Sequence, residues 1–416
     1  MPRTDDARSQ LARGGVALAV ALAAANLCGY AFNVGATRLL GPRSYGALGA
    51  LLGLVLIYNV AALGLQAVVA RRLAVTDPAS RTRVFGQVVR DGLAVALGVG
   101  LLALVLAPAT AQWLHLPSSA PALLLAGAMV PLTALGVLQG VLQGTERFGS
   151  LGLMYVVAAL GKVGGGLLGV VVERSVTGAM VGLLVGSAAA AAGCWLWLRP
   201  PLVRAGGGQL FAETAHATHA FLALFVLTNV DVLLARHYLP ERTAGLYAAG
   251  AVIAKGAFWL PQFVPVLAFP LMADPARRRN VVRLSMFAVA GAGVVVTAVC
   301  WLFGDLVVLA VGGARYDDLA PEAWWFAALG ACFACAQLLL YGRVAAEDRF
   351  AAVAVWTAAA VLAVVVAVDR NDTVVQIAST AVACAAVLVV VGMLTARRGA
   401  PTAEDAMPVM AEPTHP

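Results

Sequence analysis

Three ionisable side chains, Asp231, Lys255 and Lys162, lie inside stretches of the sequence that are otherwise apolar. A charged group at the centre of a bilayer costs roughly 2.5–3.5 kcal/mol on insertion scales. Such groups are retained where they face a water-filled cavity or a partner, and they commonly mark the path of an ion or a substrate. The pattern therefore predicts a polar site inside a membrane, with Asp231 at its centre.

Asp231 has two alternative roles. It could take up a proton or Na⁺ in a cavity, or it could form a structural pair near the outer end of its helix, five residues before Arg236. We expect its partner to be Lys255 on the next helix, so that the pair biases the movement of one part of the protein against another.

The two lysines, the only ones among 28 basic residues, also have alternative roles. Lys255 lies about twelve residues into its predicted helix, and Lys162 lies at a similar depth among glycines. Snorkelling to the membrane surface is difficult from mid-span. Each lysine is therefore predicted either to contact the cargo or to hold neighbouring helices in a fixed geometry.

Weaker candidates surround this group. Arg38 and Arg236 stand at predicted outer helix ends, where anchoring at the membrane interface is favoured. Polar side chains in or near the spans could hydrogen-bond sugars or join helices; they include Asn229, Gln139 and Gln262.

No metal site is predicted. Glu213, His216 and His219 share one helix face, but no further ligand is evident, so an interfacial polar cluster is favoured. Cys332 and Cys335 have redox spacing, but they lie on one turn of an apolar helix without a second pair, which favours apolar packing.

The composition defines the elements that must position these residues. The 416 residues are 61% hydrophobic and only 12% charged, against about 25% charged in a soluble domain. The predicted fold is therefore all-α: a polytopic membrane protein with about twelve transmembrane helices. The expected spans are 13–35, 45–68, 86–108, 119–142, 149–172, 176–198, 216–238, 243–271, 281–304, 320–342, 350–368 and 373–395. Three prolines in the eighth span predict that it kinks or ends early.

The loop arginines predict the orientation of the chain. Most of them fall on the side that includes the N-terminus, so the positive-inside rule places both termini in the cytoplasm. The net charge of +7 then reflects cytoplasmic loops, and no nucleic-acid partner is expected. The first apolar run has no cleavage-site pattern, so we expect a multi-pass protein of the cytoplasmic membrane without a cleaved signal.

The chain also repeats itself. At an offset of 198 residues Asn33 meets Asp231 and Arg38 meets Arg236, and at 199 Gly46 meets Gly245. A nearly constant offset predicts two six-helix lobes related by a pseudo-two-fold axis along the membrane normal, with a cavity between them. The expected divisions are a cytoplasmic N-terminus (1–12), an N-lobe (13–198), a cytoplasmic linker (199–215), a C-lobe (216–395) and a disordered cytoplasmic tail (396–416).

Three segments resemble one family. Residues 37–46 (TRLLGPRSYG), 142–148 (LQGTERF) and 229–248 resemble, in order, segments of bacterial polysaccharide flippases in the multidrug/oligosaccharidyl-lipid/polysaccharide exporter superfamily. The resemblance covers roughly residues 10–395. It implies a transporter, not an enzyme, that moves a polyprenyl-pyrophosphate-linked oligosaccharide or polysaccharide precursor across the membrane by alternating access.

The resemblance also implies roles for single residues. Lipid II flippases place a basic residue on their eighth helix and polysaccharide flippases often place one on their fifth, which matches Lys255 and Lys162. A lysine can clamp a pyrophosphate as a point charge. Drug-extruding relatives often carry an acid in the first helix, where this chain has Asn33. That asparagine favours a glycan cargo over the alternative, a cation-coupled multidrug-type antiporter.

The expected partners follow from this assignment. They are the lipid-linked glycan, membrane lipids and the polymerase or glycosyltransferase machinery that makes the glycan. No cofactor is expected, and transport could be coupled to a gradient of H⁺ or Na⁺ or to the membrane potential.

Overall fold

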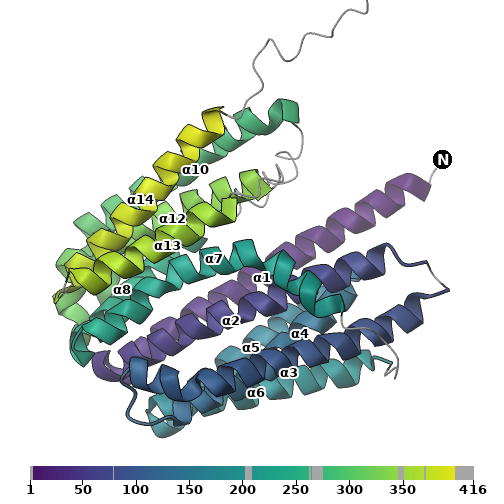
Figure 1. The fold of residues 1–416 in the computed structure, drawn as a ribbon, viewed down its shortest axis with the longest axis horizontal. Coiled ribbons are helices and arrows are strands. Elements are labelled where there is room, and N and C mark those ends of the chain that lie inside the picture. The colour runs from purple at the N-terminus through teal and green to yellow at the C-terminus, as the bar shows by residue number, and fades with distance from the viewer. Residues whose placement is uncertain are drawn as a thin grey trace, which may run out of the picture.

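The structure is a computed structural model, and it describes residues 3–77, 79–201, 209–261, 264, 275–344, 351–369 and 372–398. These residues are almost entirely helical (Figure 1). The helices of the first half are α1 (Arg3–Leu40), α2 (Pro42–Ala74), α3 (Arg81–Trp113), α4 (Ala120–Gly144), α5 (Phe148–Glu173) and α6 (Val176–Leu198). Those of the second half are α7 (Gln209–Tyr238), α8 (Glu241–Trp259), α10 (Pro275–Leu302), α11 (Gly304–Val311), the 3₁₀ helix η1 (Ala314–Glu322), α12 (Ala323–Val344), α13 (Ala351–Val368) and α14 (Val374–Arg398).

The long helices meet the requirement for crossing a membrane. Within the described residues, ten helices are long and apolar enough to span a bilayer by length and composition, and α13 adds a shorter apolar helix. The predicted eighth span corresponds to α8, which ends at Trp259, two residues before Pro261. The chain is therefore a multi-pass, all-α membrane protein.

The described helices form two lobes related by a pseudo-two-fold axis along the membrane normal. In Figure 1, α1 to α6 form one group and α8 to α14 the other, with α7 lying between them, and the groups diverge toward the end where α1 begins. Gly46 on α2 and Gly245 on α8 are equivalent by the repeat and touch each other. A Cβ added to Gly46 would lie 2.9 Å from the Gly245 backbone nitrogen. The axis therefore passes close to this contact.

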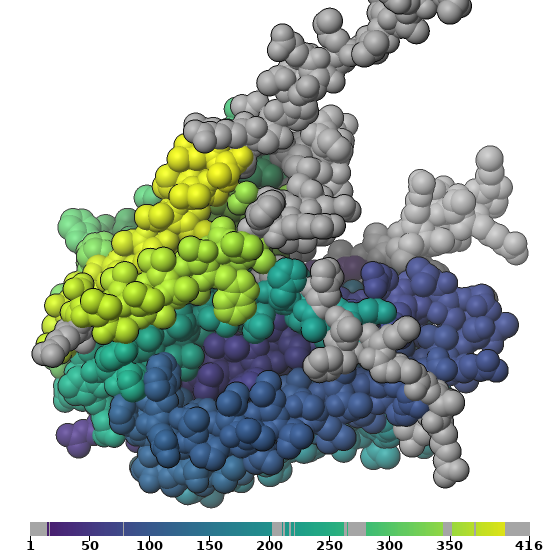
Figure 2. Space-filling model, in the orientation of Figure 1, coloured from purple at the N-terminus to yellow at the C-terminus, as the bar shows by residue number. Residues whose placement is uncertain are grey.

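The two lobes meet mainly through α2, which packs along both α7 and α8. In the space-filling view, α7 in teal lies between the blue N-lobe and the green and yellow C-lobe (Figure 2). Near the start of α7 the approach is close: a Cβ added to Gly64 would lie 1.9 Å from the Thr218 side chain. Helix α7 thus packs on the N-lobe at its beginning and on α13 and α8 of the C-lobe.

A row of glycines joins α5 to α6. Gly161, Gly165 and Gly169 on α5 face three glycines of α6, and each added Cβ would lie between 1.9 and 2.6 Å from a backbone oxygen of the other helix. Small residues at a spacing of four let membrane helices approach closely. This packing fixes α5, the helix that carries Lys162.

Two parts of the structure differ from the sequence-based expectations. Helix α7 begins at Gln209, so part of the expected linker 199–215 is helical. Residues 305–319, which lie between two expected spans, belong mostly to α11 and η1. Together α10 and α11 correspond in the repeat to the single long helix α3. The glycine pair at 312–313 and the charged residues that follow are typical of a loop. For this reason the sequence did not predict α11 and η1.

Candidate transport cavity

A cavity of about 190 Å³ lies between the lobes and contains the main predicted site residues. Asn33 on α1, Lys162 on α5, Asp231 on α7 and Lys255 on α8 all line it. Asn229 on α7 lines it as well. The lobes therefore bring together five side chains that are up to 222 positions apart in the sequence.

Asp231 is held by a tyrosine. The side chain of Asp231 is 2% exposed, and its Oδ2 accepts a hydrogen bond of 3.0 Å from the Tyr247 hydroxyl. Tyr247 is itself fully buried, and its ring packs edge to face on Phe326 with centroids 5.0 Å apart. The carboxylate is therefore fixed by a rigid aromatic side chain from the first turns of α8.

Among the described residues, the ion pairs do not include the expected one between Lys255 and Asp231, although both side chains line the same cavity. The chain reverses at Pro240, so α8 runs back along α7, and Tyr247 returns to the depth of Asp231. Lys255 lies eight residues further along α8, about two helical turns beyond Tyr247. The ion pairs found among the described residues accordingly include neither Lys255 nor Lys162.

The N-lobe contains a matching pair. Asn33, the repeat mate of Asp231, accepts a hydrogen bond of 3.1 Å at Oδ1 from the Tyr45 hydroxyl and donates one of 2.8 Å to the Gly29 carbonyl. Tyr45 is 1% exposed and lies near the start of α2. Each lobe thus presents one polar side chain of its first helix, held by a buried tyrosine near the start of its second helix.

The two halves of the cavity differ in unsatisfied polar atoms. Oδ1 of Asp231 and Oδ1 of Asn229 are both buried without a hydrogen-bond partner. The Asn229 amide nitrogen donates to the Phe225 carbonyl at 2.8 Å, which orients the oxygen away from that contact. Buried acceptors normally have a partner, so these two oxygens are suited to a proton, a cation or a donor group that enters the cavity.

The lining of the cavity carries more positive than negative side chains and is otherwise largely apolar. Its charged residues are Lys162 from the N-lobe and Lys255 and Asp231 from the C-lobe. Two cations therefore face one carboxylate. The remaining lining is largely apolar and includes aromatic rings from both lobes, among them Tyr30 and Trp259.

Arg38 and Arg236, predicted as interface anchors, each contact the backbone of the opposite lobe. Arg236 is 3% exposed and donates to the carbonyls of Leu114 (2.9 Å) and His115 (3.0 Å), just after α3. Arg38 donates to two carbonyls at the end of α11, at 2.6 and 3.2 Å. The carbonyl end of a helix attracts cations, which is consistent with both contacts. We call them the Arg236 latch and the Arg38 latch.

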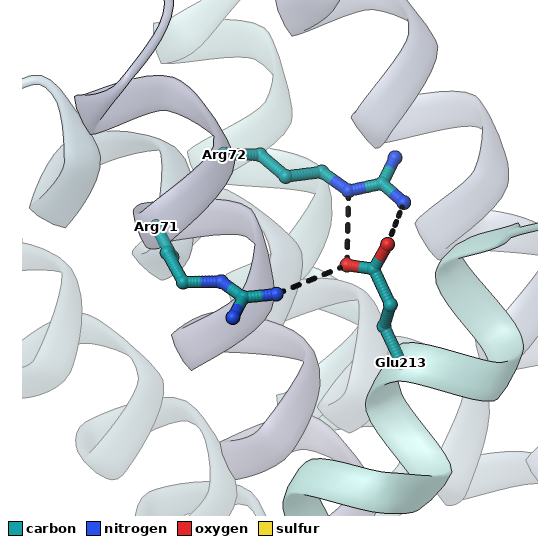
Figure 3. A network of polar contacts seen from close by, with 3 residues as sticks. All are labelled: Arg71, Arg72 and Glu213. Carbon is teal, nitrogen blue, oxygen red and sulfur yellow. Dashed lines mark hydrogen bonds and ion pairs between the residues drawn. The ribbon is translucent and has the colours of Figure 1, made fainter.

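Other predicted residues lie away from the cavity. Gln139 is buried within α4 and is not part of the lining, and Gln262 lies outside the described residues. Glu213 forms a bidentate ion pair with Arg72 (2.7 Å) and a longer one with Arg71 (3.4 Å), as Figure 3 shows. Among the described residues, none of the His, Cys, Asp and Glu side chains form a cluster that could hold a metal ion.

Sequence reasoning missed the two tyrosines and the Arg72–Glu213 pair. A signal for the tyrosines was present, since Tyr45 and Tyr247 each follow a Gly or Pro turn in segments that resemble the flippases. Nothing in the sequence indicated that the end of α2 contacts the start of α7.

Comparison with solved structures identifies the fold. The chain is similar to the inward-facing conformation of a multidrug resistance MATE family transporter of the MOP superfamily, with a TM-score of 0.74, 13% identity, and 89% of this chain and 93% of that chain covered. It is less similar to the outward-facing conformation of a multidrug resistance MATE family transporter (TM-score 0.59, 13% identity, 93% and 94% covered). A MOP superfamily transporter from Pyrococcus furiosus, described as having a binding pocket of reversed polarity, gives 0.58 at 12% identity, with 93% and 94% covered. The fold is that of the MOP superfamily transporters.

The family follows from the sequence match. The family model described as "Polysaccharide biosynthesis protein" matches residues 11–274, more than half of the chain, and the chain belongs to this family. Among curated protein sequences, none matches the chain.

Proposed function

We propose that this protein is a flippase that moves a lipid-linked oligosaccharide or polysaccharide precursor across the cytoplasmic membrane by alternating access. The observation that supports it most directly is the convergence of Lys162 and Lys255, from opposite lobes, on one cavity in a member of the polysaccharide biosynthesis family. A pyrophosphate between the two lysines would contact both lobes at once.

The arrangement supports transport without a chemical reaction on the cargo. The lysines would hold the pyrophosphate, the polar and aromatic lining would contact the sugars, and the polyprenyl tail would remain in the bilayer between the lobes. Because the pyrophosphate would contact one lysine of each lobe, cargo release would require the lobes to separate the two cations. We expect no cofactor.

Asp231 is proposed to couple this movement to a cation. Its Oδ1 and the Oδ1 of Asn229 are the two atoms of the cavity lining that are buried without a hydrogen-bond partner among the described residues, and an entering proton or Na⁺ would satisfy them. Tyr247 would keep the carboxylate in place in both charge states. The membrane potential could drive the same step.

The proposed orientation has both termini in the cytoplasm, as the arginine distribution predicts. In that orientation the Arg38 and Arg236 latches close the external side. The greater similarity to an inward-facing transporter agrees with this assignment. The expected partners are membrane lipids and the enzymes that assemble the glycan.

The test is to delete the gene and determine which leaflet holds the undecaprenyl-linked glycan. Accumulation on the cytoplasmic side is expected, and complementation by Lys162→Met or Lys255→Met should fail at normal protein levels. Lys162→Arg and Lys255→Arg, which keep the charge, serve as matched controls. An unchanged glycan distribution in the deletion strain would exclude the flippase function.

The second candidate is a cation-coupled multidrug-type antiporter, which the similarity to multidrug resistance transporters favours. The two candidates differ in the deletion strain. An antiporter predicts altered sensitivity to cationic drugs with a normal glycan. Two lysines and a single carboxylate in the lining fit an anionic cargo better than a cationic drug.

A further inference from the structure

The Arg236 latch contains titratable rings. His237, next to Arg236, has its Nδ1 2.7 Å from the Trp113 carbonyl oxygen. Its ring stacks on Trp113 with centroids 4.8 Å apart, and on His115 with centroids 5.2 Å apart. Because a carbonyl only accepts, His237 carries its proton on Nδ1, and Nε2 is left to bind a second proton.

The Arg38 latch lacks this feature. At the repeat offset of 198, the position equivalent to His237 is Leu39. The two latches therefore make the same arginine-to-carbonyl contact between the lobes, but histidines are part of only one of them. An acid-dependent change would act on the Arg236 latch alone.

The charged and titratable groups around the histidines come from three elements. Arg236 and Tyr238 belong to α7, His115 follows α3, and Glu241 begins α8, 3.5 Å from the Arg236 guanidinium. Glu241 is thus already opposite Arg236. A proton on His237 is tolerated, because a cation stacked on the Trp113 face is attracted to it. A second proton, on His115, places like charges 5.2 Å apart beside the buried guanidinium.

We propose that the Arg236 latch is a proton-sensitive switch that opens the predicted external side when both His115 and His237 are protonated. Histidine is the side-chain type whose charge ordinarily changes near physiological pH, and the latch holds two of them in contact. Repulsion between two unit charges at this spacing shifts the ratio of open to closed outer ends on the order of tenfold. The switch rests on the proposed alternation of the lobes but not on the identity of the cargo.

The test measures the outer distance directly. Spin labels are placed at Ser118→Cys and Asp317→Cys, which are exposed at the outer ends of the two lobes, after the six native cysteines are replaced. Distance distributions are recorded in lipid nanodiscs at pH 8 and pH 5 without cargo. The long-distance population is expected to rise on the order of tenfold at pH 5.

His115→Asn should abolish this rise, since asparagine tolerates the positive φ of 48° at that position and does not titrate. His237→Asn, which keeps a donor for the Trp113 carbonyl, tests the same point if the first variant does not fold. His219→Gln, at the other end of α7, is the matched control and should keep the response. Equal distributions at the two pH values, or a rise that survives in both asparagine variants, would overturn the proposal. An unchanged glycan distribution in the deletion strain, which would exclude the flippase function, would leave the result of this distance measurement unaffected.

Discussion

Adding one methyl group to Gly165 or to its neighbour Gly164 should have opposite effects. A Cβ on Gly165 would lie 2.2 Å from the Gly182 carbonyl oxygen, whereas ordinary contact begins at 3.4 Å, so α5 and α6 must separate by about 1.2 Å there. A Cβ on Gly164 meets nothing within 4 Å. The two adjacent substitutions thus differ only in the helix face that carries the methyl group.

The size of the effect follows from this difference. Overpacking against a fixed backbone costs about 1–3 kcal/mol. Replacing glycine by alanine within a helix contributes about 0.5–1 kcal/mol of stability, and this gain is common to both variants. It cancels in the comparison, so Gly165→Ala should be less stable than Gly164→Ala by about 1–3 kcal/mol.

The assay is reversible unfolding of each purified variant in the same detergent. Gly164→Ala should be at least as stable as the wild type. Transport should fall in Gly165→Ala because α5 carries Lys162 three residues away. Equal stability of the two variants would refute the reasoning, since it would mean that α5 and α6 do not meet through this face.

Three further outcomes are expected. Hydrogen bonds and attraction to Arg72 lower the pKa of Glu213 from its ordinary value of 4.5. The pair therefore stabilises the folded protein fully above pH 4.5. This contribution is lost as the pH falls through the lowered pKa. Glu213→Gln should therefore cost at most about 1 kcal/mol at neutral pH and nothing in acid, measured by unfolding across pH. Tyr247→Phe removes the hydrogen bond to Asp231 and should cost about 1–3 kcal/mol, with an altered pH dependence of transport. In Gly245→Ala the new Cβ would lie 1.8 Å from a backbone oxygen of α2. The spin-label distances should therefore show that the outer ends of the two lobes are separated even without acid. An unchanged distance distribution would argue against closure of the lobes at this contact.

Much of the cavity could be predicted because charge is rare in apolar helices. Asp231, Lys255 and Lys162 stand out against their surroundings, and the repeat adds Asn33. These four were predicted as a group, and the structure brings them to one cavity. The division into lobes followed from the constant offset, which needs no knowledge of packing.

The contacts between side chains could not be predicted in the same way. A tyrosine is ordinary in a membrane helix, and only the depth reached after the turn at Pro240 shows that Tyr247, not Lys255, meets Asp231. An arginine at a helix end has the same sequence context whether it faces lipid headgroups or a carbonyl of the other lobe. Burial of Arg236 at 3% exposure decides between them, and burial depends on the tertiary structure.

The close contact between Gly46 and Gly245 has a consequence for the ancestry of the chain. If the repeat arose by duplication, the ancestral protein was a single lobe that paired with an identical copy. The residue that is now Gly46 and Gly245 then contacted the same residue of the second copy. In that dimer the positions of Asn33 and Asp231 were occupied by the same residue, so the cavity held either two carboxylates or none. Fusion of the copies into one gene allowed a single negative charge beside the two lysines, which a symmetric pair of identical chains cannot produce.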